Sequence, residues 1–427
     1  MALIYNSLQL SPQDWPFDIS LLPQPIYLVG GAVRDSLLGR SRTDFDLDFI
    51  VPSQAIATAR RLAERYQAGF VILDEKRQIA RVVFEGGTVD CAQQEGNSLE
   101  ADLRRRDFTI NAIAYDLHHQ QFIDPLRGIK ALEKRQIVMV SVQNLRDDPL
   151  RLLRAYRQAA QLDFAIAPRT HHAICQLAPL LKTIAAERVQ TELNYLLSHE
   201  KGDRWLKMAA ADGLLSQWLD DLTSEKLQQL AQVEQCTWLL GKIWQSLGEQ
   251  LQTALGSQTL SWLALGKLAC LVGSDPNFAE HQLKKLKYSR AEIRAVKTAL
   301  TPLPRLLEVA KRPLSPREQY FFFQDVKEVF PLSMVLTVAI AAARGTLNET
   351  RAMSAVAPLI NRYLDEGDRA AHPRPLVTGR DLLQFLNLAP SPAIGQLLTE
   401  IQIAHIEGKV ETPEEALAFA AQFVERY

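Results

Sequence analysis

Three aspartates, Asp44, Asp46 and Asp48, alternate with apolar residues in one short segment. Because side chains alternate between the two faces of a β-strand, this spacing places all three carboxylates on one face. Like charges repel and acids are poor strand formers, so a merely solvated edge strand is the less favoured interpretation. Carboxylate oxygens suit Mg²⁺, and two such ions can hold an attacking hydroxyl and a leaving pyrophosphate together. The segment therefore predicts a catalytic metal site at Asp44 and Asp46.

A third carboxylate from a neighbouring strand would complete a two-metal site. Asp90, in the short run TVDCA, is the preferred candidate, and Asp48 is the alternative. A turn-capping role explains either residue equally well, so the sequence leaves the third ligand open.

A pair of glycines, Gly30 and Gly31, follows an apolar run and precedes a helical pattern. Glycine lets the backbone approach a phosphate closely, and a helix start offers free N–H groups to an anion. Arg34 lies in the first helical turn, where it could reach the same phosphates. Taken alone, this pattern fits a tight strand–helix turn. Its position just before the aspartate segment makes a nucleotide site the better interpretation.

Two further segments predict nucleotide contacts. In the first, arginines at 104–106 precede Asp107, so these arginines could hold a triphosphate and Asp107 could accept a hydrogen bond from a ribose hydroxyl. The alternative is a basic loop before a core helix. The second begins at Asp147, Asp148 and Pro149, a pattern typical of an N-cap followed by proline at the first helical position.

The same helix start could read a base. Asp147 and Asp148 lie four and three residues before Arg151, close enough for an acid to hold its guanidinium. A fixed Asp–Arg pair accepts from an exocyclic amine and donates to a ring nitrogen. Adenine and cytosine offer that pattern, whereas guanine and uracil do not. Arginine then recurs every third residue, at Arg154 and Arg157.

These residues need strands and helices to position them. Short runs rich in β-branched residues predict strands, and amphipathic patterns between them predict helices, so a mixed sheet with helices is expected before residue 141. The expected strands are 26–29, 45–51, 70–73 and 80–84, and the expected helices are 32–38 and 53–66. Beyond residue 141 the periodicity is helical throughout, and we expect no strand there.

Composition limits the class of protein. The 427 residues allow roughly two to four domains. Lys and Arg number 48 and Asp and Glu 49, which excludes a globally basic coat protein but leaves local basic grooves possible. Four cysteines without CxxC spacing argue against a disulfide scaffold. No signal peptide or membrane span is recognisable, so a cytoplasmic location is expected.

Together these segments resemble the class II tRNA nucleotidyltransferases, which comprise CCA-adding enzymes and bacterial poly(A) polymerases of the DNA polymerase beta superfamily. The resemblance continues through DPLRGIKALEKRQI (124–137), ERVQTEL (187–193) and the last fifty residues from Leu376 to Ala420. The middle of the chain, about 202–363, matches no motif of the family.

The resemblance implies an α+β head followed by an all-α neck, body and tail in an elongated, seahorse-like architecture. The corresponding boundaries are 1–140, 141–200, 201–361 and 362–427. It implies two Mg²⁺ ions at Asp44 and Asp46. It also implies nucleotide contacts from Gly30, Gly31, Arg34, Arg106, Asp107, Asp148, Arg151, Arg154 and Arg157.

The family's body and tail hold the tRNA acceptor arm. Basic residues that fit this role are Lys284, Lys285, Lys287, Arg374 and Arg380, although a solvated helix face explains each of them equally well. No obligate protein partner and no membrane are indicated.

The implied activity is template-independent addition of A and/or C from ATP or CTP to the 3′ end of tRNA, with release of pyrophosphate. Three alternatives stay open: a partial enzyme that adds only A or only CC, a poly(A) polymerase, and an inactive RNA-binding module. We expect a flexible loop within 73–98 to decide between a full CCA-adding enzyme and a partial enzyme.

Overall fold

The computed structural model describes residues 10–40, 44–256, 260–387 and 389–424, and the chain divides into two compact units. The first unit comprises Met1–Glu192 and Arg204–Gln217, and the second comprises Leu193–Asp203 and Trp218–Tyr427. Each unit is described by itself. The finer division into head, neck, body and tail stays a prediction.

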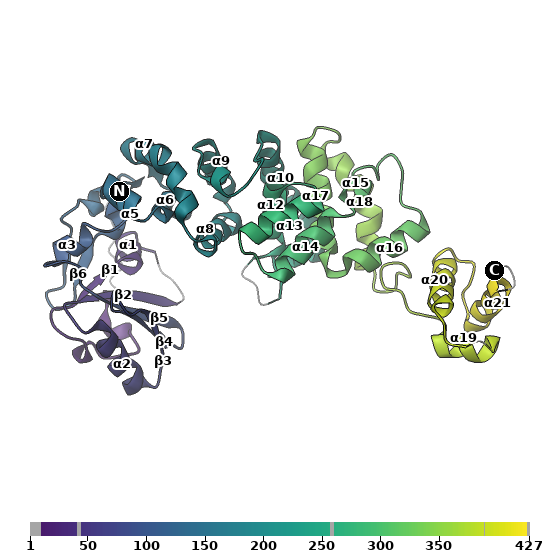
Figure 1. The fold of residues 1–427 in the computed structure, drawn as a ribbon, viewed down its shortest axis with the longest axis horizontal. Coiled ribbons are helices and arrows are strands. Elements are labelled where there is room, and N and C mark those ends of the chain that lie inside the picture. The colour runs from purple at the N-terminus through teal and green to yellow at the C-terminus, as the bar shows by residue number, and fades with distance from the viewer. Residues whose placement is uncertain (1–9, 41–43, 257–259, 388, 425–427) are drawn as a thin grey trace. The chain divides into compact units, whose positions relative to one another are not determined.

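A seven-stranded mixed sheet forms the start of the first unit, in the order β3-β4-β5-β2-β1-β6-β7 (Figure 1). The central strand β2 pairs in parallel with β5 and antiparallel with β1. The strands are β1 (Tyr27–Val29), β2 (Phe45–Val51), β3 (Gly69–Asp74), β4 (Ile79–Phe84), β5 (Gly87–Gln93), β6 (Ala114–Asp116) and β7 (Gln121–Ile123).

The predicted strands and helices of this region are confirmed to within one or two residues. Helix α1 (Gly31–Leu37) follows β1, and α2 (Ala55–Tyr66) packs on β3, β4 and β5. Alternation explains β2, because Leu47 and Phe49 are buried on the face opposite the acids. One expectation is wrong, because Asp44 lies on a bend just before β2 and not within the strand. Strands β4 and β5 occupy most of 73–98, with turns at 75–78 and 85–86 and an irregular segment at 94–98. The flexible loop expected within this range stays a prediction.

The rest of the first unit is mainly helical. Its elements, with the short helices of the preceding region, are η2 (Pro12–Asp14), η3 (Ile19–Leu21), α3 (Leu99–Leu103), η4 (Thr109–Asn111), α4 (Gly128–Glu133), α5 (Val142–Asp147), α6 (Leu150–Leu162), α7 (Pro168–Leu177), η5 (Ala178–Thr183), α8 (Ala186–Ser198), α9 (Gly202–Ala211) and η6 (Leu215–Gln217). Helices α8 and α9 each cross from one unit to the other. The expectation of no strand after 141 is wrong, because β9 (Ala165–Ile166) pairs with β8 (Gln136–Ile137).

The second unit is built from helices. They are α10 (Ser224–Ile243), α11 (Gln245–Gln252), α12 (Trp262–Val272), α13 (Pro276–Lys285), α14 (Arg290–Leu300), α15 (Leu303–Leu306), α16 (Pro316–Val326), η7 (Lys327–Val329), α17 (Phe330–Ala343) and α18 (Glu349–Leu364). Helices α10, α12 and α17 pack together, and α17 is apolar all round because it is buried on every side.

One helical stretch of the described chain, Pro316–Ala343, is long and apolar enough to cross a membrane by length and composition. However, 78% of its most apolar window is buried inside the fold. Such burial is typical of a core helix.

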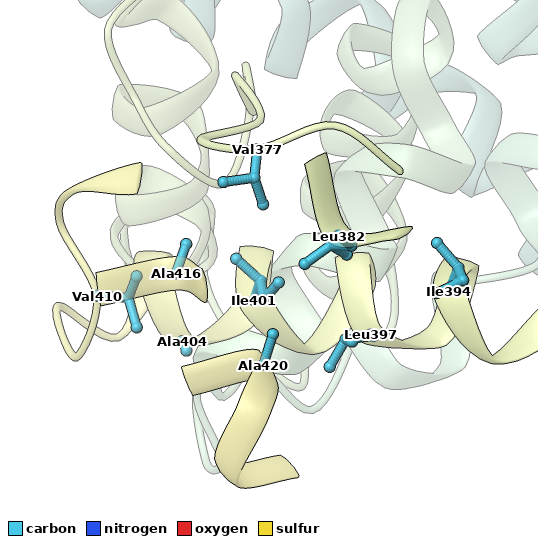
Figure 2. Close-up of a cluster of buried hydrophobic side chains, with 9 residues drawn as sticks. All are labelled: Val377, Leu382, Ile394, Leu397, Ile401, Ala404, Val410, Ala416 and Ala420. Carbon is cyan, nitrogen blue, oxygen red and sulfur yellow. The ribbon is translucent and has the colours of Figure 1, made fainter. Parts of the chain in front are cut away.

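The last three helices have a core of their own. Figure 2 shows buried residues from α19 (Gly379–Leu386), α20 (Pro392–Ile406), α21 (Pro413–Val424) and the adjoining loops pointing toward one another, among them Leu382, Ile401 and Ala416. Capping residues start two of these helices. Thr378 and Asp381 form a reciprocal capping box, and the hydroxyl of Thr412 accepts a hydrogen bond from the backbone N–H of Glu415.

Candidate active site

The acidic face of β2 lies beside β5 in register. Asp46 is opposite Thr88 and Asp48 is opposite Asp90, so all three carboxylates share one face of the sheet. Asp46 is exposed, and its Oδ1 accepts a 2.7 Å hydrogen bond from the Thr88 hydroxyl. The sheet therefore brings Asp46, Asp48 and Asp90 together, and Asp44 lies on the bend just before β2.

Gly30 and Asp48 are in close contact. Gly30 has φ +76°, and a Cβ placed on it would lie 2.6 Å from Asp48 Oδ2. Only glycine therefore fits between β1 and α1 at this point. Burial, and then the nearby charges of Asp46 and Asp90, raise the pKa of Asp48 to about 6.

The other two acids differ from Asp48 in their partners. Both oxygens of Asp90 accept hydrogen bonds from Arg81, at 2.7 and 2.8 Å, so one cation already neutralises it. Asp48 forms no ion pair within the part of the chain that the structure describes. These carboxylates carry more negative charge than the neighbouring cationic side chain neutralises, and carboxylate oxygens are the ligands that Mg²⁺ prefers. The residues present therefore fit Mg²⁺. Asp90 and Asp48 both remain candidates for the third carboxylate.

A cavity of about 690 Å³ opens on the same side of β2, two residues beyond Asp48, where Ile50 lines it together with Ala92 of β5. Charged residues of both signs line most of the rest: Arg77, Arg105, Arg106, Arg151 and Arg188, and Glu95, Asp102, Asp147 and Asp148. The clustered guanidiniums suit phosphates, and the carboxylates suit amine donors. The cavity thus has the chemistry to hold a nucleotide beside the carboxylates.

The proposed base reader lines this cavity. Asp148 Oδ2 accepts a 3.0 Å hydrogen bond from Arg188 Nη2 and lies 3.9 Å from Arg151 Nε. Asp148 Oδ1 is buried and has no hydrogen-bond partner in the described residues. Arg151 Nη1 donates to the carbonyls of Arg105 and Asn144, which fixes its guanidinium. An acceptor without a donor therefore lies beside a fixed guanidinium.

The predicted capping role of Asp148 is wrong. Helix α6 begins at Leu150 with Pro149 as its N-cap, and no side chain caps it. Asp148 instead ends α5 in an extended conformation, with φ −135° and ψ 90°. Its carboxylate is turned to Arg188 of α8, which is 40 residues away and which we did not single out from the sequence. The side chain is thereby free of the helix backbone.

Arg106 and Asp107 have contrasting surroundings. Arg106 Nε is buried without a hydrogen-bond partner in the described chain, and its other nitrogens make only long contacts, both 3.4 Å, to Asp102 and Asn111. Such a donor is available to a phosphate oxygen. Asp107 is well satisfied, since its Oδ1 accepts from Asn111 Nδ2 at 3.0 Å and from the backbone of Phe108 at 2.7 Å.

Arg34 is buried inside the first unit, apart from the cavity lining. Its Nη1 donates to Asn111 Oδ1 at 2.8 Å, and its Nε donates to Asp35 Oδ1 at 2.9 Å. Asn111 in turn donates to Asp107 and to Gln158 of α6. Asn111 thus links the glycine-turn helix to α6. Its sequence context, a polar residue inside the apolar run FTINAIAY, is the signal that could have revealed it.

Arg154 and Arg157 share one acid, Glu192 of α8. Their Nε atoms lie 3.2 and 2.5 Å from the Glu192 carboxylate oxygens, and Arg154 Nη1 lies 3.5 Å from Asp107. Glu192 is only 4% exposed. The structure therefore places these arginines in a buried network that fixes α6 against α8, rather than along the cavity. Sequence reasoning missed Glu192.

The predicted RNA-holding residues lie in the second unit. Lys284 pairs with Glu280 at 2.6 Å, and Lys285 pairs with Asp220 at 3.0 Å. Lys287 follows α13 with φ +62°. Arg374 and Arg380 are exposed, before and within α19. Their binding role stays a prediction.

Comparison with known proteins identifies the family. Residues 26–138 match the poly A polymerase head domain, 163–226 match a domain described as an RNA- and SrmB-binding site of polymerase A, and 254–421 match tRNA nucleotidyltransferase domain 2. A CC-adding tRNA nucleotidyltransferase of Synechocystis sp. is 48% identical over 412 residues, 96% of each chain. The chain belongs to the tRNA nucleotidyltransferase family.

Two further relatives are less similar in sequence than the Synechocystis enzyme. An A-adding tRNA nucleotidyltransferase of Deinococcus radiodurans is 32% identical, covering 94% of this chain and 96% of the relative. A CCA-adding enzyme of Streptococcus suis is 30% identical, covering 92% and 91%. This tRNA nucleotidyltransferase therefore has relatives with three different product specificities.

Solved structures support the fold. A CCA-adding enzyme in complex with ATP superposes with a TM-score of 0.70 at 21% identity, covering 94% of this chain and 91% of that one. The Thermotoga maritima CCA-adding enzyme complexed with tRNA gives a TM-score of 0.67 at 21% identity, covering 94% and 91%. An α+β head followed by a helical remainder is thus confirmed for this chain.

Proposed function

We propose that this nucleotidyltransferase adds cytidines from CTP to the 3′ end of tRNA and stops after CC. The 48% identity to a CC-adding enzyme over 96% of both chains carries this choice, because the A-adding and CCA-adding relatives are only 32% and 30% identical. A full CCA-adding enzyme is the second candidate, since the CCA-adding relative of Streptococcus suis is 30% identical over 92% of this chain.

The acidic face of β2 is the proposed reaction centre. Asp44 and Asp46 would hold two Mg²⁺ ions, with Asp90 or Asp48 as a third carboxylate beside them. When bound, Mg²⁺ neutralises charge on the attacking 3′-hydroxyl and on the departing pyrophosphate. The protein's own contribution is position: Gly30 leaves space for the Asp48 carboxylate, and Thr88 orients Asp46.

The cavity beside this face is the proposed nucleotide site. The unpartnered Nε of Arg106 suits a triphosphate oxygen, with Gly30 and Gly31 at the glycine turn close to Asp48. Asp107 is proposed to accept from the ribose. Arg34, Arg154 and Arg157 would act by keeping α1, α6 and α8 in place rather than by direct contact.

Cytosine fits the proposed reader. Asp148 Oδ1 lacks a donor and can accept from the exocyclic amine, and the fixed guanidinium of Arg151 can donate to the ring nitrogen. Uracil presents a carbonyl and an N–H at the same positions, so both contacts would be lost. A buried polar group left unpaired costs about 1–3 kcal/mol, which is enough to discriminate. Adenine shares the amine-and-acceptor pattern, so this pair alone does not separate A from C.

The RNA partner is proposed to be the tRNA acceptor end, held by Lys284, Lys285, Lys287, Arg374 and Arg380. Two of these lysines are already paired with acids, so their net contribution to phosphate binding would be small. A cytoplasmic location and the absence of an obligate protein partner complete the proposal.

Three tRNA transcripts test the product specificity: one lacking CCA, one lacking CA and one lacking only the terminal A. Each is incubated with CTP, with ATP and with both. We expect extension of the first two by CTP and no extension of the third. If ATP also extends the third transcript while CTP extends the first two, the protein is a CCA-adding enzyme. If only the third transcript is extended, and by ATP, the protein is an A-adding enzyme.

A further inference from the structure

A cluster of three metal-ligand side chains lies in the first unit, apart from the carboxylate face and the nucleotide cavity. His171 and Cys175 are four residues apart on α7, so both point from one face of that helix. Asp212 follows the end of α9. One ligand atom from each of the three lies within 4.8 Å of the others. Two helices distant in sequence thus converge their polar side chains on one point.

The distances within the cluster approach those of a tetrahedral site. Cys175 Sγ lies 3.8 Å from His171 Nε2, and Asp212 Oδ2 lies 2.8 Å from the same nitrogen. With metal–ligand bonds of about 2.0–2.3 Å, tetrahedral geometry separates donor atoms by about 3.4–3.7 Å. The sulfur–nitrogen distance is already close to this range. A small rotation of the Asp212 carboxylate would lengthen the oxygen–nitrogen distance to it.

A further residue, Tyr156, forms a hydrogen bond with the carboxylate of Asp212. The hydroxyl of Tyr156, on α6, donates to Asp212 Oδ2, and the Tyr156 ring is fully buried against Trp205 of α9. Ligating carboxylates are commonly held by such outer hydrogen bonds. Cys175 is exposed on the other side, so an ion can enter from solvent.

We propose that His171, Cys175 and Asp212 form a zinc site with three protein ligands, which leaves the fourth position to water. Imidazole, thiolate and carboxylate together are ligands of Zn²⁺, whereas Mg²⁺ prefers oxygen alone. The ion would connect α7 to the end of α9 and, through Tyr156, to the base-reading helix α6. It would therefore stabilise the region that supports the nucleotide cavity, independently of the proposed product specificity.

Cobalt is the probe, because Co²⁺ bound to a thiolate gives a charge-transfer absorption that oxygen ligands do not. The full chain, freed of metal by chelation and kept in excess Mg²⁺, is titrated with Co²⁺. We expect the band to saturate at one equivalent and to disappear when Zn²⁺ is added. In the same excess of Mg²⁺, but without Co²⁺, addition of Zn²⁺ should raise the melting temperature of the protein.

Matched variants locate the site. Cys175→Ser should abolish the band and the zinc-dependent rise in melting temperature, and this exposed position tolerates the change. His171→Ala should weaken binding at least tenfold, whereas His172→Ala, whose ring lies beside Gln176, should leave it unchanged. Tyr156→Phe should weaken it about tenfold or more. Absence of the band in the unaltered protein, or its persistence in Cys175→Ser, would overturn the proposal.

Discussion

Two acidic regions of the first unit differ in what surrounds their carboxylates. On β2, Asp46 and Asp48 lie side by side with Asp90, and the arginine that forms an ion pair there, Arg81, is committed to Asp90. At the start of α6, the carboxylate of Asp148 lies between Arg151 and Arg188. The first region has an excess of negative charge, and the second is close to neutral.

The difference separates the two tasks of a nucleotidyltransferase. An excess of carboxylates attracts divalent cations and serves chemistry at phosphorus. A neutral Asp–Arg pair cannot hold a metal ion strongly, but its fixed acceptor and donor can discriminate between bases. The same residue type thus has different roles because its neighbours differ.

Removal of a carboxylate from β2 should have the largest effect. Asp46→Ala should lower CTP incorporation by orders of magnitude, since a metal ligand is lost where charge develops. Asp46 is exposed, and among the described residues its carboxylate accepts a hydrogen bond only from Thr88. The circular dichroism and melting temperature of the variant should therefore stay as in the unaltered protein. Glu64→Ala, an exposed acid on α2, is the control and should retain activity. Full activity of Asp46→Ala would remove β2 from the reaction.

A glycine pair tests whether the space beside Asp48 matters. Gly30 and Gly86 both have positive φ, +76° and +84°, but a Cβ would meet Asp48 at Gly30 and nothing within 4 Å at Gly86. Each alanine variant should lose about 1–2 kcal/mol of stability from backbone strain. Only Gly30→Ala should also lose most of its activity, as measured by CTP incorporation at a temperature where both are folded. Equal activities would mean that displacing Asp48 is harmless.

Removal of Arg188 should have the smallest effect. Arg188 lines the cavity but is half exposed, so solvent screens its pair with Asp148, and Arg188→Ala should change the CTP-to-UTP preference only a few-fold. The arginine of the other region provides the contrast: Arg81→Ala should leave base preference unchanged and lower the rate, because Asp90 loses its partner. Relative incorporation of the two nucleotides and the maximal rate separate these outcomes.

The local residue pattern was sufficient to predict the strands of the sheet. It was not sufficient to predict the hydrogen-bond and ion-pair networks between elements that are distant in sequence. Alternation of apolar and acidic residues predicted β2, because that signal lies within a few neighbouring residues. The capping role predicted for Asp148 failed because its carboxylate is engaged by Arg188, 40 residues away. Glu192 was missed for the same reason, since an acid on a helix is ordinarily solvated.

The candidate site was predicted in part for the same physical reason. Asp46 and Asp48 could be placed on one face from strand periodicity alone, whereas the position of Asp90 opposite Asp48 depends on the pairing of β2 with β5. The sequence could not show that Arg34, Arg154 and Arg157 are committed to Asn111 and Glu192, because those partners come from other elements. Basic residues that looked equivalent along the chain therefore differ in their availability to a nucleotide.

Base choice by Asp148→Asn tests the account most directly. Incorporation of each of the four nucleotides is measured on a tRNA transcript lacking CCA, for the unaltered protein and for this variant. Asparagine keeps the size of the side chain but offers an N–H₂ group to the carbonyl of uracil, so the preference for CTP over UTP should fall by about tenfold or more. An unchanged preference, with both rates lowered alike, would contradict the assignment of Asp148 as the reader of the base.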